Sequence, residues 1–141
     1  MAKILIVEDD ELLREIYSDT LIGEGYEIDT AADGEEAFSK MSQGGWDLVL
    51  LDIIIPKMSG LDVAQKIKEN PPTTPIKAMV FLTNLDKGEE IKTALQLGQG
   101  YLIKSQITPG DLVREVKIYL EGGTTGTPPA TGGTPPVPPT A

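Results

Sequence analysis

The sequence predicts an α/β fold, in which five parallel strands alternate with five helices in a doubly wound sheet. Two patterns predict it. Short apolar runs recur along about 120 residues, and each is followed by a segment whose apolar residues have helical spacing. The run at residues 48–51 lacks alternation, which fits a strand covered by helices on both faces. Strict alternation of strands and helices implies a parallel sheet with right-handed crossovers.

The first half of the chain supplies three of these strands. Residues 3–7 are apolar and β-branched, and the helix expected at residues 11–22 begins after Asp10, whose carboxylate can cap it. Residues 26–31 alternate between apolar and polar side chains, which indicates an edge strand with one wetter face. An Asp-Gly turn then leads into a helix at residues 35–41, and the buried third strand follows.

The second half repeats the pattern. A helix at residues 61–69 ends at an Asn-Pro-Pro sequence, and residues 76–82 form the next buried strand. A helix at residues 87–97 ends at a glycine, and a short last strand occupies residues 101–103. A Thr-Pro pair opens the final helix at residues 110–120.

Composition excludes several kinds of chemistry. The chain has no cysteine and no histidine, which removes disulfides, thiolate nucleophiles, His-based triads and the usual zinc ligands. It carries 22 Asp and Glu against 12 Lys and Arg, which argues against a nucleic-acid or anionic-membrane surface. The N-terminus leads directly into a strand pattern, and no apolar run approaches the ~18 residues of a membrane span. We therefore expect a cytoplasmic protein whose partners are proteins or cations.

The last residues of the chain differ from the rest. Residues 122–141 contain only Gly, Thr, Pro, Ala and Val, which cannot build a core. We expect one domain at residues 1–121 and a disordered tail or linker after it. Residues 135–139 contain a PxxP spacing that a polyproline-binding groove could read, but such composition is more often a plain linker.

Polar residues of different chemistry follow four of the five predicted strands: Glu8 and Asp9, Asp52, Thr83, and Lys104. The carboxyl ends of parallel strands meet at one edge of a sheet, where such folds bind ligands. Three converging carboxylates repel one another unless a cation joins them, and Mg²⁺ suits oxygen ligands best. Asp52 is then the candidate nucleophile toward a phosphoryl group, with Lys104 and Thr83 as partners for its oxygens.

Four motifs in this order resemble the response-regulator receiver domain of two-component systems: ILIVEDD, DLVLLDIIIPKMSG, VFLTN and GYLIK. The resemblance covers residues 3–120. It implies the flavodoxin-like strand order 2-1-3-4-5, an order for which a chemotaxis receiver is itself a standard example.

The resemblance also implies roles for residues at the strand ends. Asp52 would be the phosphoacceptor for a sensor histidine kinase or phosphotransfer protein, assisted by Lys104. Glu8 and Asp9, together with Asp52, would hold Mg²⁺ or Mn²⁺, and Ile54 would lend its backbone carbonyl to the metal. The protein would be a phosphorylated signalling switch rather than a turnover enzyme.

A switch pair follows from the same resemblance. Thr83 would move toward the phosphoryl group and Tyr101 would turn inward, which would remodel the surface of helix 4, strand 5 and helix 5. The implied partners are the kinase, a downstream protein target or output domain, and in one alternative a second copy in a phosphorylation-dependent homodimer.

Several positions depart from the family pattern. Ser105 stands where a proline, often in a cis bond, is usual. Asn84 is larger than the residue usual after the threonine and is expected to narrow access to the phosphoryl group. Apolar Ile54 and Leu85 lead us to expect a long-lived phosphoryl group. Residues 98–100, Gly-Gln-Gly, replace the usual alanine and acids of dimerising relatives.

Three other functions are compatible with an α/β fold of this kind. A haloacid-dehalogenase-like phosphatase needs D-x-D at its nucleophile, whereas Ile54 stands two residues after Asp52. A mononucleotide-binding domain wants a glycine-rich or hydroxyl-rich loop after the first strand, where this chain has acids. A phosphorylation-independent receiver that only binds partners stays as the alternative, with Ser105 in its favour.

Overall fold

Strands and helices alternate strictly along the described part of the chain. The computed structural model describes residues 1–84 and 88–122, except for the side chains at 89 and 90. The strands are β1 (Lys3–Val7), β2 (Glu27–Ala31), β3 (Leu48–Asp52), β4 (Met79–Thr83) and β5 (Gly100–Ile103). The helices are α1 (Glu11–Ile22), α2 (Gly34–Ser42), α3 (Gly60–Glu69), α4 (Gly88–Leu97) and α5 (Pro109–Leu120).

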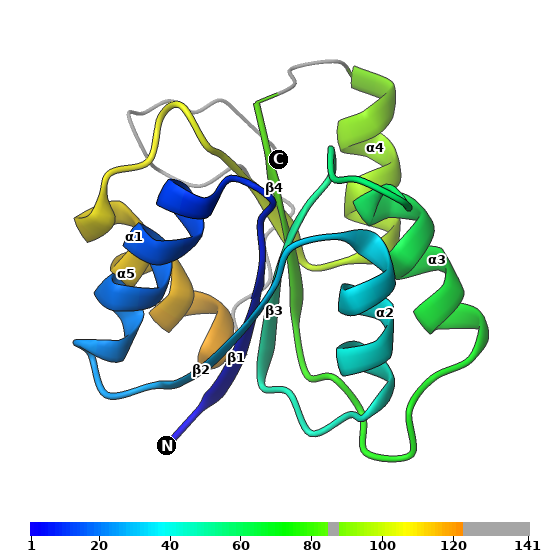
Figure 1. The fold of residues 1–141 in the computed structure, drawn as a ribbon, viewed down its shortest axis with the longest axis horizontal. Coiled ribbons are helices and arrows are strands. Elements are labelled where there is room, and N and C mark those ends of the chain that lie inside the picture. Colours follow the sequence, from blue (N-terminus) through cyan, green and yellow to red (C-terminus); the bar gives the residue numbers. More distant parts are fainter. Residues whose placement is uncertain (85–87, 123–141) are drawn as a thin grey trace.

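The strands form one parallel sheet in the order β2-β1-β3-β4-β5, which confirms the predicted fold. Helices α1 and α5 cover one face, and α2, α3 and α4 cover the other (Figure 1). Side chains of β1, β3 and β4 alternate between two buried cores, because successive residues of a strand point to opposite faces. The central strand β3 is buried along its whole length, as its lack of alternation predicted.

Two strands are shorter than predicted, and hydrogen bonds explain both differences. The amide of Tyr26 donates to the Leu21 carbonyl at the end of α1, so Tyr26 does not join β2. Before β4, the amide of Lys77 donates to the Trp46 carbonyl, outside the β3–β4 ladder that begins at Val49 and Met79. The prediction that β4 starts at residue 76 was therefore wrong by three residues.

The helix ends follow local capping chemistry. The Asp10 side chain accepts a hydrogen bond from the Leu13 amide, as predicted, and Asp33 caps α2 in the same way. Thr108 and Asp111 form a reciprocal capping box at the start of α5. Within the part of the chain that the structure describes, no helix is long and apolar enough to cross a membrane.

Some predictions fall outside the described residues. The predicted start of the fourth helix at residue 87 lies there, as does Leu85. So does the predicted tail at residues 122–141, except for Gly122.

Candidate functional site

Strand alternation brings three charged residues to one face of the sheet at its carboxyl edge. Glu8 follows β1, Asp52 ends β3 and Lys104 follows β5. The residues two positions earlier all belong to the core under α1 and α5: Ile6, Leu50 and Leu102. Residues two positions apart on a strand face the same way, so the side chains of Glu8, Asp52 and Lys104 all point toward the side of α1 and α5.

Lys104 bridges the two buried carboxylates. Its Nζ lies 2.9 Å from Glu8 Oε1 and 2.8 Å from Asp52 Oδ2. The side chains of Glu8, Asp52 and Lys104 are 0%, 2% and 11% exposed, so water screens this cluster poorly. The predicted meeting of the strand ends thus occurs as a buried ion pair between one cation and two anions.

The second oxygen of each carboxylate meets a backbone amide. The amide of Asp10 donates to Glu8 Oε2 at 3.1 Å, and the amide of Ile54 donates to Asp52 Oδ1 at 3.2 Å. Both carboxylates are therefore oriented by the loop that follows their own strand. Carboxylate oxygens can each accept more than one bond, so both retain lone pairs for another ligand.

Burial with an excess of negative charge shifts the acid–base properties of the cluster. Burial raises the pKa of Glu8 from 4.5 to about 7, against the opposing hydrogen bond from Lys104. Burial alone would lower the pKa of Lys104, but its bonds to Asp52 and Glu8 outweigh this and raise that pKa. One lysine does not neutralise two buried carboxylates, so the cluster favours a proton or another cation.

Helix α1 adds two residues that the sequence did not single out for the site. Arg14 Nη1 donates to the Glu8 carbonyl at 2.8 Å and so holds the end of β1. Tyr17 is buried beneath the acids, and burial together with the charge of Glu8 raises the pKa of its phenol to about 12. The helical spacing of the apolar residues predicted Tyr17 only as a buried residue of the helix. Nothing in the sequence pattern distinguished Arg14.

The acidic residues fit a hard divalent cation. Glu8, Asp9 and Asp52 each offer a carboxylate oxygen, and these oxygens lie within 4.8 Å of one another. Glu8 and Asp52 are buried whereas Asp9 is exposed, which leaves the cluster open to solvent on one side. An oxygen-only donor set with a net negative charge suits Mg²⁺ or Mn²⁺.

The predicted switch pair, Thr83 and Tyr101, lies on the strands β4 and β5. Thr83 ends β4 and is 1% exposed, and its carbonyl accepts a hydrogen bond from the Lys104 amide at 2.8 Å. Tyr101 pairs with Phe81 in the β4–β5 ladder, is half-buried, and packs against the core under α2, α3 and α4. By strand alternation, Thr83 and Tyr101 therefore belong to the face of the sheet opposite to that of Lys104.

The residues that depart from the family pattern differ in their exposure and contacts. Ser105 and Asn84 are both exposed. No described peptide bond is cis, so Ser105 follows Lys104 in a trans bond. Gln99 contacts the start of β4, where its Oε1 accepts a hydrogen bond from the Met79 amide at 2.6 Å.

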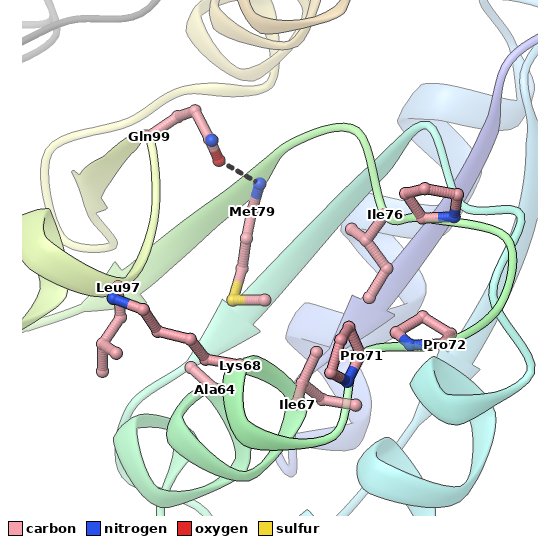
Figure 2. A pocket seen from close by; sticks show the side chains of 10 residues that line it. Ala64, Ile67, Lys68, Pro71, Pro72, Ile76, Met79, Leu97 and Gln99 are labelled. Atoms are coloured by element: carbon pink, nitrogen blue, oxygen red, sulfur yellow. Dashed lines mark hydrogen bonds between the residues drawn. The ribbon is translucent and has the colours of Figure 1, made fainter.

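An apolar groove lies at the opposite end of the domain. Figure 2 shows it between α3, the loop before β4 and the end of α4, with Gln99 bonded to Met79 at its edge. Its volume is about 310 Å³. Among the described residues that line it, Lys68 alone is charged, and none is a carboxylate, a histidine or a cysteine.

Comparisons with known proteins agree with this geometry. A family model described as the response regulator receiver domain matches residues 4–117. The transcriptional regulatory protein DltR of Streptococcus agalactiae is 33% identical over 116 residues, which are 82% of this chain and 50% of that protein. The chain spans about half the length of the first curated relatives that it matches.

Solved structures show the same fold. A CheY-like receiver domain protein from Methanospirillum hungatei is 28% identical with a TM-score of 0.77, covering 86% of this chain and 95% of that one. The response regulator TrrA from Thermotoga maritima, in complex with Mg²⁺ and BeF, is 34% identical with a TM-score of 0.71. That match covers 85% of this chain and 99% of that one.

Proposed function

Because this chain belongs to the response regulator receiver family of two-component systems, we propose that Asp52 accepts a phosphoryl group from a sensor histidine kinase or a phosphotransfer protein. The observation that carries the proposal is the buried Asp52 carboxylate, which is paired with Lys104 and adjoins Glu8 and Asp9. Receiver domains bind Mg²⁺ in an acidic pocket, and the Thermotoga relative binds Mg²⁺ and BeF.

Three carboxylates and one carbonyl would hold the metal. Glu8, Asp9 and Asp52 supply the anionic oxygens, and the backbone carbonyl of Ile54 is the fourth protein ligand that the family implies. Bound Mg²⁺ or Mn²⁺ neutralises negative charge on the oxygens of the transferred group. The raised pKa of Glu8 means that ligand binding also has to displace a proton near neutral pH.

The phosphoryl transfer uses Asp52 as the nucleophile. One of its oxygens forms a new bond to phosphorus while the bond from phosphorus to the donor nitrogen breaks, and the electron pair leaves with the donor. The product is an acyl phosphate with additional negative charge. In the unphosphorylated structure Lys104 Nζ donates to Asp52 Oδ2, and after the transfer it can pair with a phosphoryl oxygen instead. The Thr83 hydroxyl can donate to another phosphoryl oxygen.

Phosphorylation would then change the surface of α4, β5 and α5. Thr83 moves toward the new group and half-buried Tyr101 turns inward, which shifts an equilibrium between two conformations. The module turns over no external substrate. A downstream protein or an output domain reads this surface, and a second copy of the chain is an alternative reader.

The relatives and the charge of the chain indicate whether this segment contacts nucleic acid itself. The match to its curated relatives named as transcriptional regulators spans about half of their length. This segment is strongly acidic, with a formal net charge of -10, which disfavours direct contact with nucleic acid or anionic membranes. We therefore assign the segment a signalling role in the cytoplasm and leave any DNA contact to a partner or another domain.

Incubation with acetyl phosphate and Mg²⁺, followed by intact-mass measurement, tests the proposal. We expect one phosphoryl adduct on the wild-type chain, no adduct in the presence of EDTA, and none on Asp52→Asn. An adduct that persists on Asp52→Asn, or a wild-type chain that stays unmodified, would refute the role of Asp52.

A phosphorylation-independent binding module is the second candidate, and Ser105 in place of the usual proline favours it. Lys104 nevertheless reaches both carboxylates, so this substitution does not remove the ion pair next to Asp52. The two functions differ in one measurement. Addition of acetyl phosphate changes the affinity for a partner only if the module is a phosphorylation switch.

A further inference from the structure

Lys57 has an unusual backbone conformation in the loop between β3 and α3. Its φ is 71°, and no other described residue except glycine has a positive φ. A side chain in this left-handed region costs free energy that glycine would avoid. Lys57 is therefore a strained residue five positions after Asp52.

The Lys57 side chain contacts the turn between β2 and α2. Its Nζ lies 3.6 Å from Asp33 Oδ2 and 3.7 Å from Glu35 Oε1. Asp33 is fixed in this position because its other oxygen caps α2 by accepting from the Glu36 amide at 2.8 Å. The lysine thus reaches two carboxylates on a neighbouring loop, one of which is held rigidly by the helix.

The backbones of the two loops also meet. The Gly34 amide donates to the Pro56 carbonyl at 3.0 Å. A Cβ on Gly34 would overlap the Met58 carbonyl oxygen, so the turn approaches the loop as closely as only glycine permits. A charge pair and a backbone hydrogen bond together fasten the β2–α2 turn to the β3–α3 loop.

The other end of this loop orients the phosphoacceptor. The Ile54 amide donates to Asp52 Oδ1 at 3.2 Å, and the Gly60 amide donates to the Ile53 carbonyl at 2.8 Å. A Cβ on Gly60 would overlap the Asp52 carbonyl oxygen, so the start of α3 also packs directly on the end of β3. Any shift of the loop therefore changes the direction of the Ile54 amide and the orientation of Asp52.

We propose that Lys57 is a positioning residue for Asp52: its ion pairs with Asp33 and Glu35 hold the β3–α3 loop in the arrangement in which the Ile54 amide contacts Asp52. Lys57 is 55% exposed and Glu35 68%, so salt weakens this hold. The effect on reactivity rests on the proposed phosphorylation of Asp52, whereas the effect on the loop does not.

Lys57→Gly separates positioning from general stability. It removes the backbone strain and the ion pairs together, so we expect unfolding at an equal or higher urea concentration than wild type. We expect hydrogen exchange at the Gly34 and Ile54 amides to accelerate by about two- to fivefold, the range that loss of a surface ion pair supports. The rate of Asp52 phosphorylation by acetyl phosphate should fall by a similar factor.

Two further variants are controls. Lys57→Arg keeps the charge at the same position and should restore slow exchange and the wild-type rate. Lys77→Ala removes a comparable surface ion pair, 3.1 Å from Asp47 at the other end of the sheet, and should change neither readout.

Unchanged exchange at Gly34 and Ile54 in Lys57→Gly would overturn the proposal. A purely structural role would also overturn it, and would appear as a loss of stability in Lys57→Gly that parallels its loss of rate. If the wild-type chain forms no phosphoryl adduct, the proposed function fails, while the exchange measurements still decide whether Lys57 holds the loop.

Discussion

Glu8 gives the sharpest quantitative prediction, because it is a fully buried carboxylate that shares one lysine with Asp52. Replacing it with glutamine keeps the shape of the protonated acid and removes its charge. The substitution therefore tests whether the charged form of Glu8 destabilises the metal-free fold.

The magnitude follows from the pKa of Glu8, which burial raises from 4.5 to about 7. Because the folded protein holds the proton more tightly than the unfolded chain does, Glu8 contributes stability below pH 4.5 that is lost as pH rises through 7. The loss amounts to about 3 kcal/mol at about 1.4 kcal/mol for each pH unit. We expect Glu8→Gln to match the wild type below pH 4.5 and to exceed its stability by about 3 kcal/mol near pH 8.

Urea unfolding in EDTA measures this difference, with the single, buried Trp46 as the fluorescence reporter. The difference between variant and wild type should grow from about pH 4.5 to about pH 7 and then level off. Glu15→Gln, which removes an exposed carboxylate from the same region, should show no such trend. A difference that is constant with pH, or that favours the wild type at pH 8, would refute the account of Glu8.

Three other substitutions test separate contacts by urea unfolding. Lys104→Met leaves two buried carboxylates without their cation and should cost about 3 kcal/mol at pH 8 and less at pH 5; an equal loss at both pH values would contradict the charge argument. Gly34→Ala forces a Cβ onto the Met58 carbonyl and should cost about 1–3 kcal/mol; wild-type stability would mean that the loops are not in close contact. Thr108→Ala removes a capping box and should lower the free energy of unfolding by about 1 kcal/mol, whereas Thr108→Ser keeps the hydroxyl and should keep most of the wild-type stability.

The sequence predicted the parallel sheet, its layers and the meeting of Glu8, Asp52 and Lys104 because these depend on regular patterns, whereas the strand order came from the resemblance to receiver domains. Alternation along strands fixes the face to which a side chain points. Parallel topology then gathers the strand ends at one edge. The element ends at Tyr26 and residue 76 were missed because single hydrogen bonds to neighbouring segments decided them.

The contacts around Lys57 could not be predicted from the sequence. They join a turn near Asp33 to a loop more than twenty residues later, and no periodicity relates the two segments. The positive φ of Lys57 is equally hidden, because a lysine in a turn gives no sign that it adopts a conformation typical of glycine. The complete burial of Glu8 was also missed, since its neighbours Asp9 and Asp10 are exposed.

Chemical trapping of the phosphorylated residue tests the central claim most directly. Borohydride reduces an acyl phosphate on aspartate to homoserine, and peptide mapping after treatment with acetyl phosphate and Mg²⁺ locates that residue in the chain. We predict homoserine at position 52 alone, and none when Mg²⁺ is replaced by EDTA. Homoserine at position 9, or no homoserine in a chain that carries the phosphoryl group, would contradict the assignment of Asp52 as the phosphoacceptor.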